Sequence, residues 1–251
     1  MEMALVVLAV GVVLATLMIT TNRAGSNLSV ADEALMDSAA SRLFDFARRN
    51  GRLPCPDVNG DGFEDASNGV CAADIKSGGV PYTTLGMVLS GPLGTGIDRQ
   101  FIYSVYRGGG NASQDLTLAA ERSLPAADAA GSGSYMNLDD FKQAVINGLA
   151  AAPDNRELHV TGNDADSGPS NCTLPGPNMA FVLAYAGGGN ADGAGGDFDG
   201  ANPAGGWSQG NKWAAVKPAV CFAGPGKPHT PTYDDQVRAV SFTELLGVLN
   251  R

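Results

Sequence analysis

An uncharged apolar run near the start of the chain limits its possible folds more than any other feature. The run extends from Met3 to Asn22, between Glu2 and Arg23. As a helix, Met3–Ile19 would span about 25 Å, close to the hydrocarbon thickness of a bilayer. A carboxylate costs roughly 2.5–3.5 kcal/mol at mid-bilayer and less near the interface, so such a group is usually kept for a partner. The run therefore predicts a membrane-anchored subunit that assembles with others.

A second helical pattern comes after the apolar run. Apolar residues recur at spacings of three and four, which is typical of one buried stripe on an amphipathic helix. We expect the two parts to form one long helix from Glu2 to Asn50, about 70 Å in length, with soft points at Gly11 and Gly25-Ser26. Asn50-Gly51 ends this helix, with Pro54 just beyond it. The stripe consists of Leu28, Ala31, Leu35, Ala39, Leu43 and Phe46.

Beyond this helix, Gly, Pro, Asn and Asp separate short apolar segments, a pattern typical of strands joined by turns. A further helix is expected at Leu138–Leu149, where Asn137 and Asp140 make an approximate capping box. A short C-terminal helix is expected at Thr243–Leu249. The segment Gly108–Ser134 is rich in Gly, Ala and Ser, which predicts a long loop. The predicted strands are Gln100–Arg107, Leu158–Thr161, Met179–Ala186 and Val237–Phe242.

These elements predict an α+β fold in two parts. Residues 1–50 form the long N-terminal α-helix, and residues 51–251 form a C-terminal globular head built on an antiparallel β-sheet with Gly-rich loops. The chain has 251 residues, enough for one substantial core and a small insertion. We place the insertion around residues 108–176.

Charge and composition exclude two classes of protein. The chain carries 16 Lys and Arg against 26 Asp and Glu, a net charge of -10, and has no basic run longer than Arg48-Arg49. A nucleic-acid-binding protein would show a basic patch, so no nucleic-acid partner is expected. Hydrophobic residues make up 44% of the chain, which excludes a disordered protein.

The cysteines indicate an oxidising compartment. An even number of cysteines in a membrane-anchored chain favours disulfides. The four residues are Cys55, Cys71, Cys172 and Cys221. They allow three pairings, of which we favour Cys55–Cys71 with Cys172–Cys221, because each pair brackets one loop-rich stretch. Free buried thiols are the alternative. A zinc site is not expected, because the chain has no CxxC motif and no cysteine beside a histidine.

Several motifs resemble the type IV pilins and the related type II secretion pseudopilins. The stretch Glu2–Leu8, with Gly11 just beyond it, is similar to the glutamate, apolar run and mid-helix glycine of that family. Three further segments, Gly51–Asp57, Gly60–Gly62 and Thr84–Gly86, are similar to a region common after the first helix in pilin-like sequences. The acidic segment Tyr233–Val237 resembles one near their C-termini. The resemblance covers residues 1–90 well and residues 232–251 loosely, and Gly108–Gly176 has no counterpart.

The resemblance implies a structural subunit of an extracellular type IV pilus-like helical filament. Such a subunit is a homopolymer-forming protein held in the inner membrane before assembly, and its partners are the pilus assembly machinery and a prepilin peptidase. The alternatives are a type II secretion pseudopilin and a minor tip pilin or adhesin that binds a surface ligand. In the family the glutamate lies a few residues inside the mature, methylated N-terminus, so we expect a few residues to precede Met1. The assembly contacts implied by the resemblance are Glu2, Leu5, Leu8, Gly11 and Leu14.

Two acidic stretches are candidate cation sites. The first places oxygen-bearing side chains at the first, third and fifth positions and Gly62 at the sixth, like the start of a calcium loop. Its twelfth residue is Asn68 instead of an acid, so an Asx-rich turn is the alternative. The second stretch, Asn190–Gly200, is either a loop that wraps a cation or an exposed flexible loop. The candidate calcium ligands of the first stretch are Asp57, Asn59, Asp61, Glu64 and Asp65.

Catalytic motifs are scarce. The only histidines are His159 and His229, and the chain contains no GxSxG elbow, no HExxH motif and no phosphate-binding loop. Carboxylates are abundant, but nothing in the sequence singles out a pair suited to hydrolysis. We therefore expect no enzymatic activity.

Overall fold

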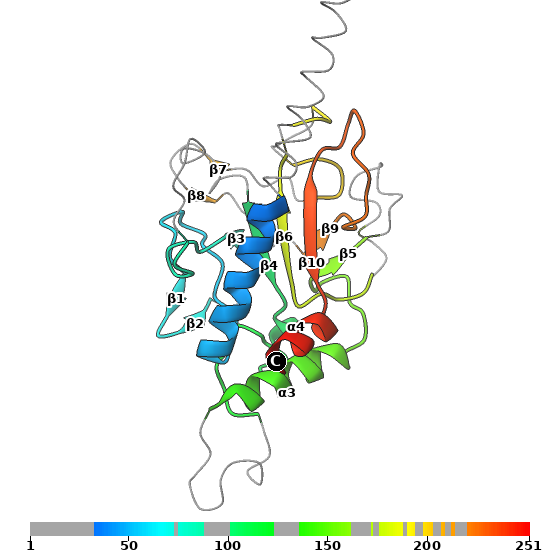
Figure 1. The fold of residues 1–251 in the computed structure, drawn as a ribbon. Coiled ribbons are helices and arrows are strands. Elements are labelled where there is room, and N and C mark those ends of the chain that lie inside the picture. The colour runs from blue at the N-terminus through cyan, green and yellow to red at the C-terminus, as the bar shows by residue number, and fades with distance from the viewer. Residues whose placement is uncertain are drawn as a thin grey trace, which may run out of the picture.

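A four-stranded antiparallel sheet lies at the centre of the computed structural model (Figure 1). Its strand order is β10 (Gln236–Val240), β6 (Phe181–Tyr185), β4 (Phe101–Val105) and β3 (Ser77–Gly79). Helices and sheet are mixed along the chain, so the fold is α+β. The structure describes residues 33–72, 75–87, 101–122, 136–161, 172, 176–187, 190–193, 198–202, 207–208, 212–213 and 220–251.

The two central strands, β4 and β6, are buried on both faces, which explains their nearly continuous apolar sequences. Alternate residues point to opposite faces of a sheet, and here they belong to two separate cores. The first core takes Phe101, Tyr103 and Val105 of β4 with Phe181, Leu183 and Tyr185 of β6. The second takes Ile102, Val182 and Ala184.

The first helix of the described residues, residues 33–50, covers the first core (Figure 1). Its aromatic contact with the sheet is Phe44 against Phe181, with ring centroids 5.6 Å apart in an edge-on arrangement. It ends at Gly51, whose φ of 61° is readily available only to glycine and whose N–H donates to Ala47 O at 2.9 Å. The buried stripe consists of Met36, Ala39, Ala40, Leu43, Phe46 and Ala47.

The prediction of one long N-terminal helix is wrong. The first helix covers only residues 33–50, which is 18 residues, and no helix within the described ranges is long and apolar enough to cross a membrane. A regular apolar spacing stabilises a helix mainly where another surface buries the stripe, and the sheet supplies that surface to residues 33–50. The apolar run Met3–Asn22 lies outside the described residues.

Helix α3 (Leu138–Leu149) has the bounds expected from the sequence. Its capping box is complete: Asn137 Oδ1 accepts from the Asp139 and Asp140 amides at 2.7 and 3.4 Å, and Asp140 Oδ2 accepts from the Asn137 amide at 2.8 Å. Asp140 is buried, and its second oxygen, Oδ1, is satisfied there by the Arg122 amide, which donates to it at 2.6 Å. Local chemistry thus fixes the start of this helix.

Helix α4 (Phe242–Leu249) begins one residue before its expected start and packs against α3. Its first residue, Phe242, was expected to end a strand, but Ser241 caps the helix by accepting the Glu244 amide on Oγ at 3.1 Å. The Phe242 ring lies against Gly148 of α3, where an added Cβ would approach ring atom Cε1 to 2.5 Å. Glycine at this position therefore sets the close approach of the two helices.

The second core lies on the opposite face of the sheet from helix 33–50. It is closed by two short parallel strands, β5 (His159–Val160) and β9 (Cys221–Phe222), and by residues such as Phe198 and Tyr233. The sequence did not predict five strands of two residues each, because such short strands carry no periodicity of their own. They are β1 (Ala66–Ser67), β2 (Val70–Cys71), β7 (Trp207–Ser208), β8 (Lys212–Trp213) and β9; β1 pairs with β2, and β7 pairs with β8. A short 3-10 helix, η1, covers Gly108–Gly110.

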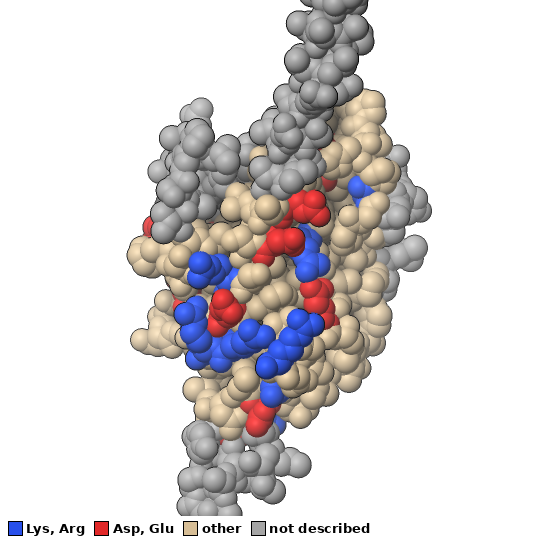
Figure 2. Space-filling view, viewed as in Figure 1, with Lys and Arg blue, Asp and Glu red and all other residues tan. Residues whose placement is uncertain are grey.

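The surface over helix 33–50 and α4 carries both signs of charge. Figure 2 shows Lys and Arg side chains interspersed with Asp and Glu on this face. Arg238 illustrates the mixing, because it lies 3.6 Å from Asp37 of the first helix and 2.6 Å from Glu244 of α4. Such exposed pairs contribute little stability.

Candidate functional site

The residues expected to make assembly contacts lie outside the described part of the chain. Their roles therefore stay predictions. They are Glu2, Leu5, Leu8, Gly11 and Leu14.

Both expected disulfides are present. Cys55 pairs with Cys71, and Cys172 pairs with Cys221, so the predicted pairing is confirmed. The first bond ties the segment after helix 33–50 to strand β2. The second brings Cys172 to strand β9 beside the second core. Each crosslink lowers the conformational entropy of the unfolded chain, which stabilises a head rich in loops.

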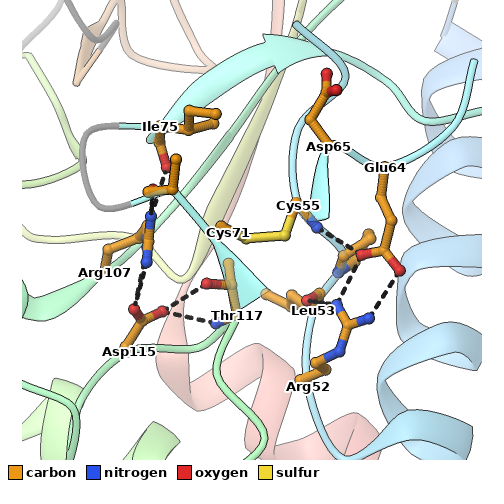
Figure 3. The surroundings of a disulfide bond; sticks show 12 residues. Arg52, Leu53, Cys55, Glu64, Asp65, Cys71, Ile75, Arg107, Asp115 and Thr117 are labelled. Atoms are coloured by element: carbon orange, nitrogen blue, oxygen red, sulfur yellow. Dashed lines mark hydrogen bonds and ion pairs between the residues drawn. A yellow bond between two sulfur atoms is a disulfide. The ribbon is translucent and has the colours of Figure 1, made fainter. Parts of the chain in front are cut away.

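A buried ion pair adjoins the first disulfide (Figure 3). Arg52 and Glu64 make two parallel hydrogen bonds, Nη1 to Oε2 and Nη2 to Oε1, both of 2.7 Å. Glu64 Oε2 also accepts the Cys55 amide at 3.0 Å, and the Arg52 guanidinium lies 5.2 Å from the centroid of the Phe46 ring. The pair joins the end of helix 33–50 to the acidic loop. The sequence pattern indicated Glu64 as a calcium ligand and gave no sign of Arg52 as its partner.

A second buried ion pair lies on the other side of the same disulfide (Figure 3). Arg107 Nη2 and Nε donate to Asp115 Oδ2 at 2.9 and 3.0 Å. The same guanidinium donates from Nη1 to the backbone oxygens of Ala72 and Ile75. Asp115 Oδ1 in turn accepts from the Thr117 amide and hydroxyl. Together with Arg52–Glu64, this pair brackets Cys55–Cys71 with satisfied charged groups.

The first candidate calcium loop uses its acids to bind its own backbone. Asp57 Oδ1 and Oδ2 accept from the Gly60 and Gly62 amides at 2.6 and 2.8 Å. Asp65 Oδ2 accepts from the Asn59 amide at 3.1 Å, and Asn59 Oδ1 and Asp61 Oδ1 each accept an amide two residues ahead. These contacts are those of an Asx-rich turn, the second of the two interpretations. Calcium at these residues stays a prediction.

The protonation of this loop is determined by the same contacts. Burial raises the pKa of Asp57, and this effect outweighs the hydrogen bonds from the Gly60 and Gly62 amides. Burial would also raise the pKa of Glu64, but the hydrogen bonds from Arg52 and the Cys55 amide outweigh burial and lower that pKa. Glu64 is therefore held as a carboxylate, which fits a structural ion pair.

The second acidic stretch contributes to a different arrangement. Within the described residues, one group of three carboxylates has ligand oxygens that all lie within 4.8 Å of one another: Asp199, Asp234 and Asp235. Asp199 belongs to the predicted stretch Asn190–Gly200, and the other two belong to the acidic segment noted near the C-terminus. Burial, and after it the proximity of Asp199 and Asp234, raises the pKa of Asp235 to about 7, against the hydrogen bond from Asn202. The sequence did not indicate that these acids meet.

The two histidines differ in burial and in their contacts. His159 is fully buried in β5, and its Nδ1 lies 2.8 Å from Glu157 O. His229 is exposed, in the turn region before β10. Within the part of the chain that the structure describes, neither histidine forms a nucleophile–base pair at hydrogen-bonding distance, the geometry that covalent catalysis requires.

No protein-family model, no curated protein and no solved structure matches this chain. The resemblance to type IV pilins therefore depends on the sequence motifs alone.

Proposed function

We propose that this chain is a structural subunit of an extracellular type IV pilus-like helical filament. The subunit is held in the inner membrane through its N-terminal apolar segment and then polymerises with identical copies. Its assembly requires the pilus assembly machinery and a prepilin peptidase, and the subunit itself performs no catalysis.

The observation that carries this proposal is the single carboxylate, Glu2, at the tip of the uncharged run Met3–Asn22. In lipid this carboxylate has no counter-charge and is costly. In a bundle of identical segments it can pair with the N-terminal ammonium of a neighbouring copy. Because removing one partner from a buried ion pair is strongly destabilising, only one axial stagger between neighbours is then favourable. Glu2 would therefore specify the register of the filament.

The head supports an extracytoplasmic location. Its two disulfides, Cys55–Cys71 and Cys172–Cys221, are typical of proteins in oxidising compartments. They hold together a head with many glycine-containing loops, which suits a subunit that works outside the cell.

Filaments sheared from cells test this proposal. We expect this chain to be their major protein band. The variant Glu2→Ala should remain in the membrane fraction but give fewer filaments. The control variant Glu33→Ala removes an exposed acid of helix 33–50 and should leave the filament yield unchanged. Normal filament yield and register from Glu2→Ala would refute the role given to this residue.

The same preparation separates the alternative functions. A type II secretion pseudopilin should be missing from sheared surface filaments and present in the periplasm of secreting cells. A minor tip pilin or adhesin should appear in the filaments in trace amounts, and its loss should reduce surface binding more than filament yield.

A further inference from the structure

Four asparagines of the chain are followed directly by glycine. An asparagine in this context can react with its own backbone, because the amide nitrogen of the next residue can attack the side-chain carbonyl carbon, Cγ. Glycine favours the attack, since it has no Cβ to hinder the approach and adopts many backbone conformations. In a folded chain the reaction also requires both groups to be free to move. The pairs are Asn50-Gly51, Asn59-Gly60, Asn68-Gly69 and Asn147-Gly148.

Hydrogen bonds hold both reacting groups of the pair at the end of helix 33–50. Asn50 Nδ2 donates to Phe46 O at 2.8 Å, and the Gly51 amide donates to Ala47 O at 2.9 Å. These two bonds form the last turn of a helix that packs on the sheet. The attack at Asn50 therefore requires that turn to unwind.

The pair in the first acidic loop is held in the same way. Asn59 Nδ2 donates to Asp65 Oδ1 at 2.9 Å, and the Gly60 amide donates to Asp57 Oδ1 at 2.6 Å. Asn59 Oδ1 also accepts the Asp61 amide at 2.9 Å. The side chain is thus fixed at both its nitrogen and its oxygen, and a carboxylate engages the attacking amide.

The third held pair lies within α3. Asn147 Nδ2 donates to Ser113 O at 3.0 Å, and Asn147 Oδ1 accepts from Gln143 Nε2 at 2.9 Å. The Gly148 amide belongs to the helix, where each backbone N–H donates to the carbonyl four residues earlier. Gly148 is also buried against the Phe242 ring. The attack at Asn147 therefore requires α3 to open.

Neither reacting group of Asn68-Gly69 is held. The pair forms the two-residue turn between β1 and β2, where Ser67 pairs with Val70. The φ values of 53° and 75° are both positive, as in a type I′ turn. Asn68 is exposed, and within the described part of the chain neither its side chain nor the Gly69 amide makes a hydrogen bond. A Cβ on Gly69 would meet nothing within 4 Å, so the space beside the turn is open.

We propose that Asn68 is a site of spontaneous deamidation. The Gly69 nitrogen gives its proton to hydroxide and bonds to Asn68 Cγ, while the Cγ–Nδ2 bond breaks and Nδ2 takes up a proton and leaves as ammonia. Water then opens the cyclic imide at either carbonyl, which gives aspartate or isoaspartate. The net reaction consumes water and releases ammonia, and nothing is oxidised or reduced.

The hairpin allows the backbone rotation that ring closure needs. Strands β1 and β2 have two residues each, and an isolated two-stranded hairpin is marginally stable at best. It can therefore open locally while the cores stay folded, and the Cys55–Cys71 disulfide keeps its base closed. Each reaction adds a negative charge at the exposed turn, and isoaspartate also routes the backbone through the side chain. Modified chains should accumulate as the protein ages.

Peptide mapping by mass spectrometry tests the proposal. The full-length chain, in a mild nonionic detergent, is incubated at mildly alkaline pH below its unfolding temperature and sampled over time. We expect Asn68 to deamidate at least about tenfold faster than each of the other three asparagines, because hydrogen bonds must break at each of those. Isoaspartyl methyltransferase should label the same peptide. The variant Asn68→Gly suits a turn with positive φ and should abolish this product.

The unfolded chain is the matched control. In urea with the disulfides reduced, the hydrogen bonds are lost and the four asparagines should deamidate at similar rates. Equal rates at the four sites of the folded chain, or a faster rate at one of the held pairs, would overturn the proposal. So would a folded chain in which Asn68 stays intact while it reacts in urea. A preference for Asn68 that is equally large in urea would assign the reaction to the local sequence and refute the role of the fold.

Discussion

Two glycines in neighbouring helices should respond to the same substitution with opposite signs. Gly148 lies in α3 and Gly247 in α4, and alanine favours a helix interior over glycine by up to about 1 kcal/mol. A Cβ on Gly247 would meet nothing within 4 Å, whereas a Cβ on Gly148 would lie 2.5, 3.0 and 3.2 Å from three atoms of the Phe242 ring. The Phe242 ring cannot move away freely, because it is 3% exposed and packs edge-on against Tyr106 at 4.9 Å.

These contacts give the expected magnitudes. Overpacking a well-packed core typically costs 1–3 kcal/mol, and the helix propensity of alanine offsets part of that cost. We expect Gly148→Ala to lower the free energy of unfolding by about 1–2 kcal/mol and Gly247→Ala to raise it by about 0.5–1 kcal/mol. In a chain of this size, 1 kcal/mol corresponds to about 2–4 °C in Tm.

Urea unfolding of the full-length chain in a nonionic detergent measures both effects, with far-ultraviolet circular dichroism as the signal. The double variant Gly148→Ala/Phe242→Leu adds a coupling test, because a smaller side chain at position 242 should recover part of the loss. If Gly148→Ala stabilises the chain as much as Gly247→Ala does, the close packing of α3 against α4 is refuted.

Three further predictions concern the Arg52–Glu64 ion pair and the Cys172–Cys221 disulfide. Glu64→Gln should cost about 3 kcal/mol, because it leaves the Arg52 guanidinium buried without its counter-charge. By contrast, Asp154→Asn changes an exposed pair with Arg156 and should leave the urea midpoint nearly unchanged. Since the folded-state pKa of Glu64 is lowered, its contribution is present above the ordinary value near 4.5 and is lost as pH falls below it. Glu64→Gln should therefore flatten the stability profile between about pH 5 and pH 3; an unchanged slope contradicts this. Replacing Cys172 and Cys221 by alanine opens a link of 49 residues and should cost about 4 kcal/mol, measured as a urea midpoint; a loss below about 1 kcal/mol contradicts a stabilising role.

Local signals in the sequence were sufficient for the regular elements. The spacing of apolar residues and the Asn137 and Asp140 caps placed α3 at Leu138–Leu149, as observed. The apolar runs placed β4 and β6, because strands buried on both faces are apolar throughout. The same kind of signal failed for the long N-terminal helix, because the first helix covers residues 33–50 and is stabilised by the sheet that buries its apolar stripe.

Strand β3 was beyond sequence reasoning for a different reason. Its sequence, Ser77-Gly78-Gly79, has low strand propensity. It pairs with β4 and with the backbone of Asp57. A Cβ on Gly78 would lie only 2.5 Å from Asp57 O, so this close approach requires glycine. Only the contact between distant segments makes these glycines a strand.

The sequence by itself determined the apolar run with its single Glu2, helix α3 and the central strands, because each has a signal within a few residues. It favoured the observed disulfide pairing among three possible ones. Only the tertiary structure decided which acids serve the backbone and which converge. Asp57 and Asp65 bind amides within their own loop, while Asp199 meets Asp235 across a separation of 36 residues. Convergence of distant side chains depends on strand register and loop closure, and neither leaves a local pattern in the sequence.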